Sequence, residues 1–468
     1  MWLLCALVCT AGMAQTADGK PVLHVLTFDD GAAVTNLSDN GKWAVCAGAS
    51  ADNANFYTGA RLVDVATGQA QTLMGGLVEA EVFSISAHDV TDDGQIVVGQ
   101  VNSKPGYYNV AEQQWHFVAL DGDADCGSIR SVTPDGRYAV GILNYSSEAR
   151  LYEEKAAMWN LATGELMPLP GIPTADMSHQ DQGMNRFTAI SADGNKVIGC
   201  MSFSYLPTDF DLGGCFYYVY YTDTHTYKPI GFTETTSGRW KPDVEGTVFI
   251  EMANLSANGR YATGAAHMSK AIPGSDFPSE YVVPFVFDTE TGDFSLYDDE
   301  ESTSRYGWVI ENDGTCYSAG PAANPYRDFG VRSGKFWIDF GQAISQRYGL
   351  TLADKINAEN SGTLMGISND GCTFAVLIGP HESYLATLPE PFKNIAASTN
   401  LLSNYTVSPT PGVTLSRIST LTLTFDRNVR VAGDATAVEL LDRSNNVVAN
   451  SVGFSSDEGS NVVTITFR

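Results

Sequence analysis

The sequence lacks long apolar runs and is poor in basic residues. Beyond the first 14 residues, no segment approaches the roughly 20 apolar residues of a membrane-spanning helix, so we expect no membrane insertion. The chain carries 27 basic and 54 acidic residues, which gives a net charge of −27. This charge argues against nucleic acid and anionic membranes as partners. We interpret it as a solubility feature of an exported protein, with cation binding as the alternative.

The sequence also lacks the cysteine spacing of zinc sites. No Cys-x-x-Cys pair occurs among the eight cysteines, so zinc is not expected. Cys200 and Cys215 flank one loop and could form a disulfide between adjacent strands in an oxidising compartment. Other cysteines lie in or beside apolar strands, where a buried thiol packs as a small apolar side chain.

Motifs of nucleophilic and metal-dependent catalysis are absent as well. Neither Gly-x-Ser-x-Gly nor His-x-x-x-His occurs, and the seven histidines are scattered. Catalysis by a pair of carboxylates remains an alternative, because 54 acidic residues place many acids near one another. We therefore favour a protein that is not an enzyme and expect no cofactor, with structural calcium as the alternative.

One stretch organises the sequence, because it recurs seven times; its clearest copy covers residues 188–199. Each copy has a branched aliphatic residue, then Ser or Thr, then an Asp-Gly or Asn-Gly pair, except that the sixth copy has Glu311 in place of Ser or Thr. The glycines of these pairs are Gly41, Gly94, Gly136, Gly194, Gly259, Gly314 and Gly371.

The repeat predicts β-hairpins. Asp-Gly and Asn-Gly favour a two-residue type I′ turn, which needs positive φ at both central positions. The flanking runs, such as residues 196–198, are β-branched and nearly continuous, so both strand faces should be buried. A weaker second repeat predicts another turn that begins at Asp64, Asn160 and Asp288 and has Gly68, Gly164 and Gly292 in the left-handed position.

Two hairpins in each unit make a four-stranded blade. Successive turn glycines lie 42 to 65 residues apart, which suits such a blade with loops of variable length. The sequence therefore predicts an all-β fold, a seven-bladed β-propeller, with an all-β solenoid as the alternative.

The ends of the repeat region suggest how the ring closes. Residues 22–28 form a strand with no hairpin of their own, and the last blade is one strand short after residues 384–388. We expect the N-terminal strand to complete that blade and cover its edge. Helical spacing within residues 336–358 predicts a short helix.

We expect four parts along the chain. Residues 1–14 are apolar and end in small residues, as in a signal peptide cleaved after Ala14. The propeller should cover residues 15–390, and residues 391–402 should form a linker. Alternating apolar residues over 403–468 predict an Ig-like β-sandwich that is incomplete at its end.

The repeat resembles the HAF-type extracellular repeats of secreted bacterial β-propellers, whose units have the form Ala-x-x-Ile-Ser-x-Asp-Gly-x-x-Val-Val-Gly. The resemblance covers most of residues 22–390. The Asp-Gly hairpin is also similar to that of TolB-type periplasmic propellers. The segment Leu-Thr-Leu-Thr-Phe-Asp-Arg-Asn-Val, which begins at Leu421, resembles bacterial Ig-like domains of the S-layer-protein type. These resemblances imply export to the periplasm, the cell surface or the medium.

Two candidate sites follow from residue types and spacing. Asp121, Asp123 and Asp125 alternate as in a calcium loop, although the glycine falls one place late; a solvated acidic turn is the alternative. Five polar residues lie six to nine places before their turn glycines and could converge at the channel mouth on a carboxylate or sulfated ligand, unless they are surface or capping side chains. They are His88, Arg130, Arg186, Glu251 and Arg305.

These observations favour a binding or scaffold protein outside the cell or at its surface. Insertions at residues 201–214 and 267–280 enlarge the loops on one side of the ring, and loops often carry binding functions. The expected ligand is a protein or a glycan at that loop-rich face. An extracellular hydrolase acting on glycan or peptide, with acids at the channel mouth, is the alternative.

Overall fold

The structure is a computed structural model of the chain. It describes residues 20–28, 31–50, 53–122, 124–145, 153–170, 182–203, 214–234, 240–270, 279–296, 307–319, 329–333, 336–348, 362–378, 382–398, 405–408, 420–425, 452–455 and 462–467. The chain divides into two compact units, Met1–Ala396 and Ala397–Arg468. The expected signal peptide, residues 1–14, lies outside the described residues.

The described part of the first unit contains seven antiparallel sheets of four strands, numbered here in chain order. Sheet one contains β2 (Ala32–Leu37), β3 (Trp43–Ser50), β4 (Asn53–Asp64) and β5 (Ala70–Thr72); sheet two, β6 (Ile85–Val90), β7 (Ile96–Val101), β8 (Lys104–Asn109) and β9 (Gln114–Phe117); sheet three, β10 (Cys126–Val132), β11 (Tyr138–Tyr145), β12 (Glu153–Asn160) and β13 (Glu165–Leu166); sheet four, β14 (Gln182–Ile190), β15 (Lys196–Phe203), β16 (Gly214–Tyr221) and β17 (Thr226–Pro229). Sheet five contains β20 (Thr247–Leu255), β21 (Tyr261–Lys270), β22 (Ser279–Asp288) and β23 (Phe294–Leu296); sheet six, β24 (Gly307–Ile310), β25 (Cys316–Ala319), β26 (Phe329–Ser333) and β27 (Phe336–Asp339); sheet seven, β28 (Gly362–Ile367), β29 (Thr373–Ile378), β30 (Glu382–Thr387) and β1 (Val22–Thr27).

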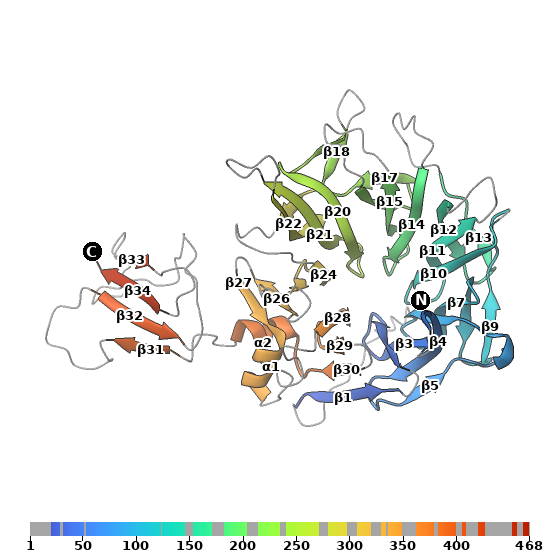
Figure 1. Ribbon diagram of the computed structural model, residues 1–468, viewed down its shortest axis with the longest axis horizontal. Coiled ribbons are helices and arrows are strands. Elements are labelled where there is room, and N and C mark those ends of the chain that lie inside the picture. The colour runs from blue at the N-terminus through green and yellow to red at the C-terminus, as the bar shows by residue number, and fades with distance from the viewer. Residues whose placement is uncertain are drawn as a thin grey trace, which may run out of the picture. The chain divides into compact units, whose positions relative to one another are not determined.

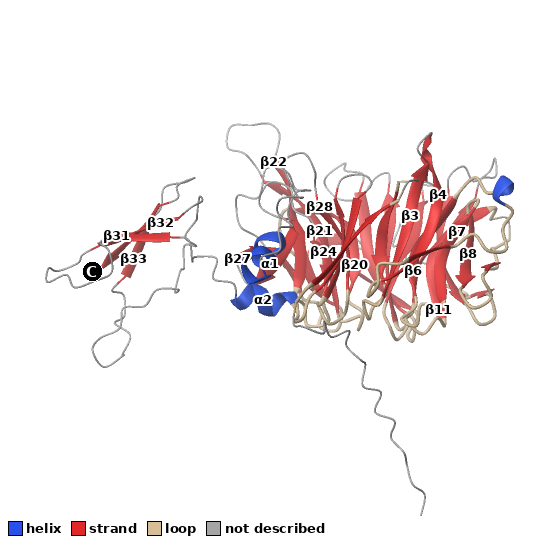
Figure 2. Cartoon of the chain, turned by 90° about the horizontal axis from the view of Figure 1, so that it is seen from below, coloured by secondary structure: helices blue, strands red, loops and turns tan. Residues whose placement is uncertain are grey.

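The sheets are arranged around a common centre, as in a β-propeller (Figure 1). The first strand of each sheet contacts the first strand of the next, and β28 of sheet seven contacts β2 of sheet one. The first strands are therefore the innermost ones. The short Asp-Gly and Asn-Gly turns lie along one edge of this unit, the lower edge in Figure 2. We call this edge the turn rim. The fold is a propeller and not the alternative solenoid.

The N-terminal strand closes sheet seven. Strand β1 pairs antiparallel with β30, with Val25 opposite Tyr384. Leu26 of β1 is buried in a cluster that includes Leu385 of β30 and Val34 of sheet one. The predicted pairing of the N-terminal strand with the last blade is confirmed.

The hairpin turns differ from the prediction. At each repeat the glycine has positive φ, for example 69° at Gly41, but the Asp or Asn before it does not. The turn is a β-turn that Gly41 N closes onto Ser38 O at 2.9 Å, inside a longer loop closed by Ser38 N and Trp43 O. The predicted two-residue type I′ turn is therefore wrong. Side chains explain the difference, because Ser38 Oγ donates to Asn40 Oδ1 and accepts from Trp43 N, which stabilises the longer loop.

The turn glycines also pack between sheets. A Cβ atom on Gly94 would overlap the Trp43 indole of sheet one, and one on Gly194 would lie 2.9 Å from Tyr138 Cδ2 of sheet three. Glycine is thus needed both for its backbone conformation and for the approach of neighbouring sheets. In the second turn, Gly68, Gly164 and Gly292 have positive φ and donate to Asp64, Asn160 and Asp288, as predicted.

The core lies between adjacent sheets, because both faces of most strands are covered. In β15, Val197 belongs to the cluster shared with sheet three, and its neighbour Ile198 belongs to the cluster shared with sheet five. Both side chains are fully buried. The continuous apolar runs of the sequence are therefore buried on both faces of the strands, as predicted.

Two helices accompany sheets six and seven. Helix α1 (Phe340–Tyr348) lies where a short helix was predicted. Helix α2 (Phe392–Ser398) covers much of the expected linker, residues 391–402, and this part of the prediction is wrong. Phe392 is fully buried, with its ring 4.7 Å from Phe340, so apolar packing holds this segment against the propeller. A short 3-10 helix, η1 (Glu79–Glu81), and the hairpin of β18 (Phe232–Glu234) and β19 (Trp240–Pro242) complete this unit's described elements.

The second unit has one sheet in its described part. Its strands are ordered β31 (Tyr405–Ser408), β32 (Thr420–Phe425), β34 (Val462–Phe467) and β33 (Val452–Ser455), all antiparallel. In the described part of the whole chain, no helix has both the length and the apolarity to span a membrane.

Candidate functional site

Each innermost strand contains a β-bulge near its middle. In sheet two the register shifts between Ala87 and Asp89, and in sheet three between Ile129 and Ser131. The other five innermost strands shift at equivalent places. A bulge redirects a side chain that the regular alternation would place elsewhere. The residues six places before the turn glycines are Thr35, His88, Arg130, Thr188, Ala253, Trp308 and Met365.

Two of the predicted site residues meet at these bulges. Arg130 Nη1 lies 3.0 Å from His88 Nδ1, so the side chains join the innermost strands of sheets two and three, β6 and β10. Arg130 is exposed, and His88 is half-buried with its Nε2 atom 2.7 Å from Ser86 Oγ. The structure therefore brings together His88 and Arg130 of the five predicted residues.

The contacts fix the protonation state of His88. A guanidinium group can only donate, so His88 Nδ1 must accept, and the ring proton lies on Nε2 and is donated to Ser86. Burial and the positive charge of Arg130 lower the pKa of His88 to about 3. His88 is thus a neutral imidazole. Of the two residues in this pair, only Arg130 therefore carries a positive charge, whereas both were predicted to belong to a cationic cluster.

A buried carboxylate lies one residue beyond the bulge in sheet two. Asp89 is 7% exposed, and its oxygens accept hydrogen bonds from the Asn36 side chain, Val90 N, Ser131 Oγ and Val132 N. Burial raises the pKa of Asp89 to about 7, although the hydrogen bonds from Val90, Ser131 and Val132 oppose the shift. The contacts reach sheet one and sheet three, so Asp89 fixes the two strands beside the bulged His88.

Arg186 and Glu251 occupy a different register from the bulge residues, eight places before their glycines. Arg186 Nε donates to Cys200 Sγ at 3.0 Å. Glu251 Oε2 lies 2.6 Å from His267 Nε2, and the His267 ring stacks on Phe249 at 3.9 Å. These side chains make contacts within their own sheets.

The predicted disulfide between Cys200 and Cys215 is wrong. Cys200 carries a thiol. In the register of β15 and β16, Cys215 is opposite Ser202, while Cys200 is opposite Tyr217. Residues displaced by two positions across a pair of strands have Cα atoms about 7–8 Å apart, which exceeds the usual reach of a disulfide.

The remaining predicted site residues are only partly described. Arg305 and Asp123 lie outside the described residues. Asp121 and Asp125 are exposed, and an Asp121 carboxylate oxygen accepts from the Tyr145 hydroxyl at 2.9 Å. Among the described residues, no group of three or more His, Cys, Asp or Glu side chains is arranged to hold a metal ion. Calcium binding by Asp121, Asp123 and Asp125 stays a prediction.

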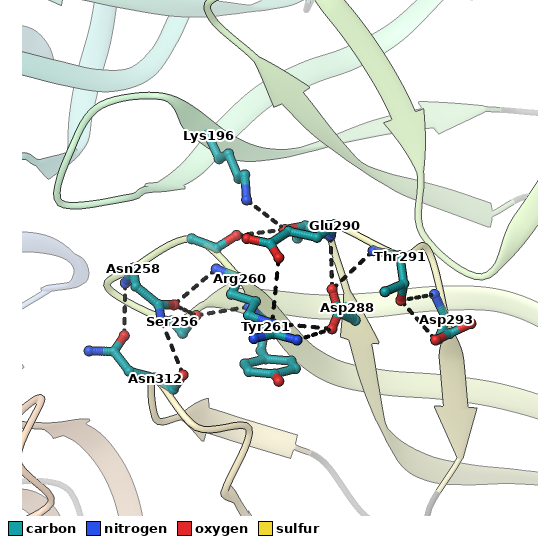
Figure 3. A network of polar contacts seen from close by, with 12 residues as sticks. Lys196, Ser256, Asn258, Arg260, Tyr261, Asp288, Glu290, Thr291, Asp293 and Asn312 are labelled. Carbon is teal, nitrogen blue, oxygen red and sulfur yellow. Dashed lines mark hydrogen bonds and ion pairs between the residues drawn. The ribbon is translucent and has the colours of Figure 1, made fainter.

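The turn rim carries a second polar network. Figure 3 shows its part on sheet five, where Asn258 N donates to Asn312 Oδ1 of sheet six at 2.8 Å and Arg260 donates to Asp288. Similar links join other sheets, such as Asn369 N to Asp39 O at 2.7 Å. Since the polar groups satisfy one another between neighbouring turns, we interpret this network as structural.

Thr35, Ser86 and Asp89 contribute to this site and were not predicted from the sequence. Thr35 Oγ1 donates to Ala87 O of sheet two at 3.0 Å, beside His88. A signal for Thr35 was present in the sequence, because Thr35, His88 and Arg130 share one offset from the turn glycine. The broader window of six to nine residues concealed that common offset.

No family model matches the chain, and no curated protein sequence matches it. Among solved structures, the chain is similar to an oligogalacturonate lyase from Vibrio parahaemolyticus at 13% identity, with a TM-score of 0.46 over 79% of this chain and 98% of the other. It is similar to the hydrazine synthase of Kuenenia stuttgartiensis at 13% identity, with a TM-score of 0.43 over 75% and 94%. For TolB from Acinetobacter baumannii the identity is 13% and the TM-score 0.31 over 60% and 58%. Such distant similarity carries no argument about function, and the propeller fold rests on the chain's own sheets.

Proposed function

We propose that this protein is a non-catalytic binding or scaffold protein that acts outside the cell or at its surface. Its ligand, a protein or a glycan, binds at the loop-rich propeller face, toward the centre of the ring. One observation carries the proposal: an exposed cation, Arg130, is held in place by a residue of the neighbouring sheet in a protein of net charge −27. An exposed cation whose guanidinium is oriented by a neighbouring side chain suits recognition of a polar or anionic group.

The proposal includes the architecture that presents this site. We propose that all seven four-stranded sheets are blades of one closed ring, supported by the contact of β28 with β2 and the pairing of β1 with β30. We propose that the second unit is part of an Ig-like sandwich, supported by its antiparallel sheet. Export is supported by the apolar segment and small residues within residues 1–14.

The test is a binding screen of the purified full chain on a glycan array and a peptide array, with hydrolysis of the same compounds followed in parallel. We expect saturable binding without turnover. Product formation at a rate above that of a heat-denatured control would contradict a non-catalytic function. Absence of binding to every compound on both arrays would contradict the binding function itself.

An extracellular hydrolase is the second candidate. The contact of Glu251 on β20 with His267 on the adjacent strand β21 favours it, because a carboxylate and an imidazole 2.6 Å apart can exchange a proton with a substrate. If the parallel assay detects turnover, Glu251→Gln should abolish it. Turnover that survives Glu251→Gln would exclude this pair from the reaction.

A further inference from the structure

We propose a second binding site on sheet three, where Asn144 and Glu154 bind the ammonium group of a lysine side chain from a protein partner. This assignment rests on the proposed binding function and names the chemical group that the partner presents. At this site it selects a protein over a glycan.

Asn144 of β11 and Glu154 of β12 lie on the face of sheet three that packs against sheet four. They are directly opposite each other, four residues along their strands from the opposite pair Val140 and Met158. Those two apolar residues belong to the cluster shared with sheet four. Side chains at even spacing along a strand share one face. Both polar residues lie near the strand ends that are opposite the turn rim, on the side of the longer loops.

Each of these side chains has a buried acceptor atom without a donor. Asn144 Oδ1 and Glu154 Oε2 accept no hydrogen bond from any described residue. Arg186 of sheet four is close enough for the charge of Glu154 to act on it, but its Nε atom donates to Cys200. Buried polar groups are nearly always paired, so two unpaired acceptors on opposite residues point to a ligand that supplies donors.

The Asn144 amide is oriented by Cys126, which lies opposite it on β10. Burial and Asp125 raise the pKa of the Cys126 thiol, and a side-chain hydrogen bond with Asn144 opposes this shift. A hydrogen bond lowers the pKa of a thiol when it is donated to the sulfur. The Asn144 nitrogen is therefore the donor to Cys126, and Oδ1 is left as an acceptor.

A group that carries only donors matches two acceptors. A primary ammonium has three N–H donors, no acceptor and a positive charge that complements Glu154. Directly opposite residues have Cβ atoms about 4.5–5.5 Å apart, so both oxygens can reach one nitrogen atom. A metal ion fits less well, because the described residues contain no group of three or more His, Cys, Asp or Glu arranged to hold one.

The burial of the two oxygens favours lysine as the source of the ammonium. Asn144 and Glu154 are half-buried residues, but the acceptor atoms themselves are buried. A lysine carries its ammonium at the end of a flexible four-carbon chain that can reach such atoms. In an amino sugar the amino group is attached directly to a bulky ring, which cannot approach them as closely.

The experiment is isothermal titration calorimetry of the full chain with Nα-acetyl-L-lysine amide and with the same compound acetylated at Nε. We expect the amine to bind at least about tenfold more tightly, because acetylation removes the charge and two of the three donors. D-Glucosamine and calcium chloride are titrated alongside. Equal affinity for the two lysine compounds, or tighter binding of glucosamine than of the lysine amine, would overturn the assignment.

A charge-removing variant separates binding from structure. Glu154→Gln should reduce affinity for the amine at least about tenfold and should keep or raise the melting temperature, because its new amide nitrogen can donate to Asn144 Oδ1. Glu165→Gln removes the same charge from an exposed position on β13 of this sheet and should change neither quantity. Equal losses of affinity would indicate a general charge effect, and a lower melting temperature in Glu154→Gln would indicate a structural role. Either result overturns the site.

Asn144→Leu removes the second acceptor and should also weaken binding of the amine, with a thermal melt to establish that it is folded. Normal binding by folded Asn144→Leu would exclude Asn144 from the site. Calcium binding that Glu154→Gln abolishes would identify a metal site and overturn the ammonium assignment. If ligands from the peptide array bind wild type and Glu154→Gln equally, the binding function stands and this inference fails.

Discussion

Lys393 Nζ donates a hydrogen bond to Glu311 Oε2 at 2.7 Å, joining helix α2 to the turn of sheet six. Glu311 is the acid that replaces Ser or Thr in one repeat, and it is 4% exposed. Lys393 also contacts Asp313 Oδ2 at 2.6 Å, and the Tyr317 hydroxyl donates to Glu311. Glu311, which replaces Ser or Thr in the sixth repeat, therefore has a cationic partner, Lys393, 82 residues further along the chain. This match explains how a carboxylate is tolerated in a buried turn.

The first prediction concerns this ion pair. Lys393→Met should lower the free energy of unfolding by about 2 kcal/mol, because Glu311 would remain buried without its cation. Adding Glu311→Ser, the residue that other repeats have, should recover most of the loss. Chemical denaturation of the wild type, both single variants and the double variant measures the coupling. Additive effects would contradict a direct interaction.

The second prediction concerns the turn glycines. Gly94→Ala should destabilise the protein by about 2–4 kcal/mol, since alanine strains a backbone with φ of 69° and its Cβ overlaps Trp43. Gly164→Ala is the matched control: φ is 70°, but no atom lies within 4 Å of the added Cβ. It should cost only the backbone strain, about 1 kcal/mol. Equal losses in denaturation experiments would refute the packing role of Gly94.

The third prediction concerns closure by β1. Deletion of residues 15–30 should lower the melting temperature sharply, because the edge of β30 loses its partner. Leu26→Ala should cost about 2–4 kcal/mol, as the side chain is 5% exposed. Val25→Ala, 51% exposed on the same strand, should change stability by less than about 0.5 kcal/mol. An unchanged melt of the deletion variant would exclude a structural role for this strand.

The fourth prediction concerns pH. Burial and the nearby charge of Asp92 raise the pKa of Asp39 from 3.8 to about 6. Between these values the folded state holds a proton that the unfolded state releases, so this contribution to stability is full below pH 3.8 and is lost as pH rises through about 6. Asp39→Asn should therefore gain stability relative to wild type, by about 1 kcal/mol, at pH 8 but not at pH 3.5. Melting curves at both pH values measure this difference, and a pH-independent difference would argue against titration of Asp39.

The periodicity of the sequence was enough to predict hairpins, blades and closure by the N-terminal strand. This was possible because turns and strand burial depend on local residue types, and the turn glycines and apolar runs recur at regular places. The turn type was predicted wrongly, because it depends on side-chain hydrogen bonds such as that of Ser38 to Asn40. The linker was predicted wrongly because helix α2 owes its place to contacts of Phe392 with residues distant in sequence.

The sequence by itself determined that the chain forms repeated, doubly buried antiparallel sheets, since that information lies in spacing of a few residues. Only the tertiary structure decided which polar side chains meet. A bulge inserts one residue into a strand and so changes the face of the sheet to which the side chains point. His88 and Arg130 come together at such bulges, while Arg186 and Glu251 make contacts within their own sheets. The physical reason is that strand register and the contact between neighbouring sheets are set by the packing of the whole ring, which no local pattern encodes.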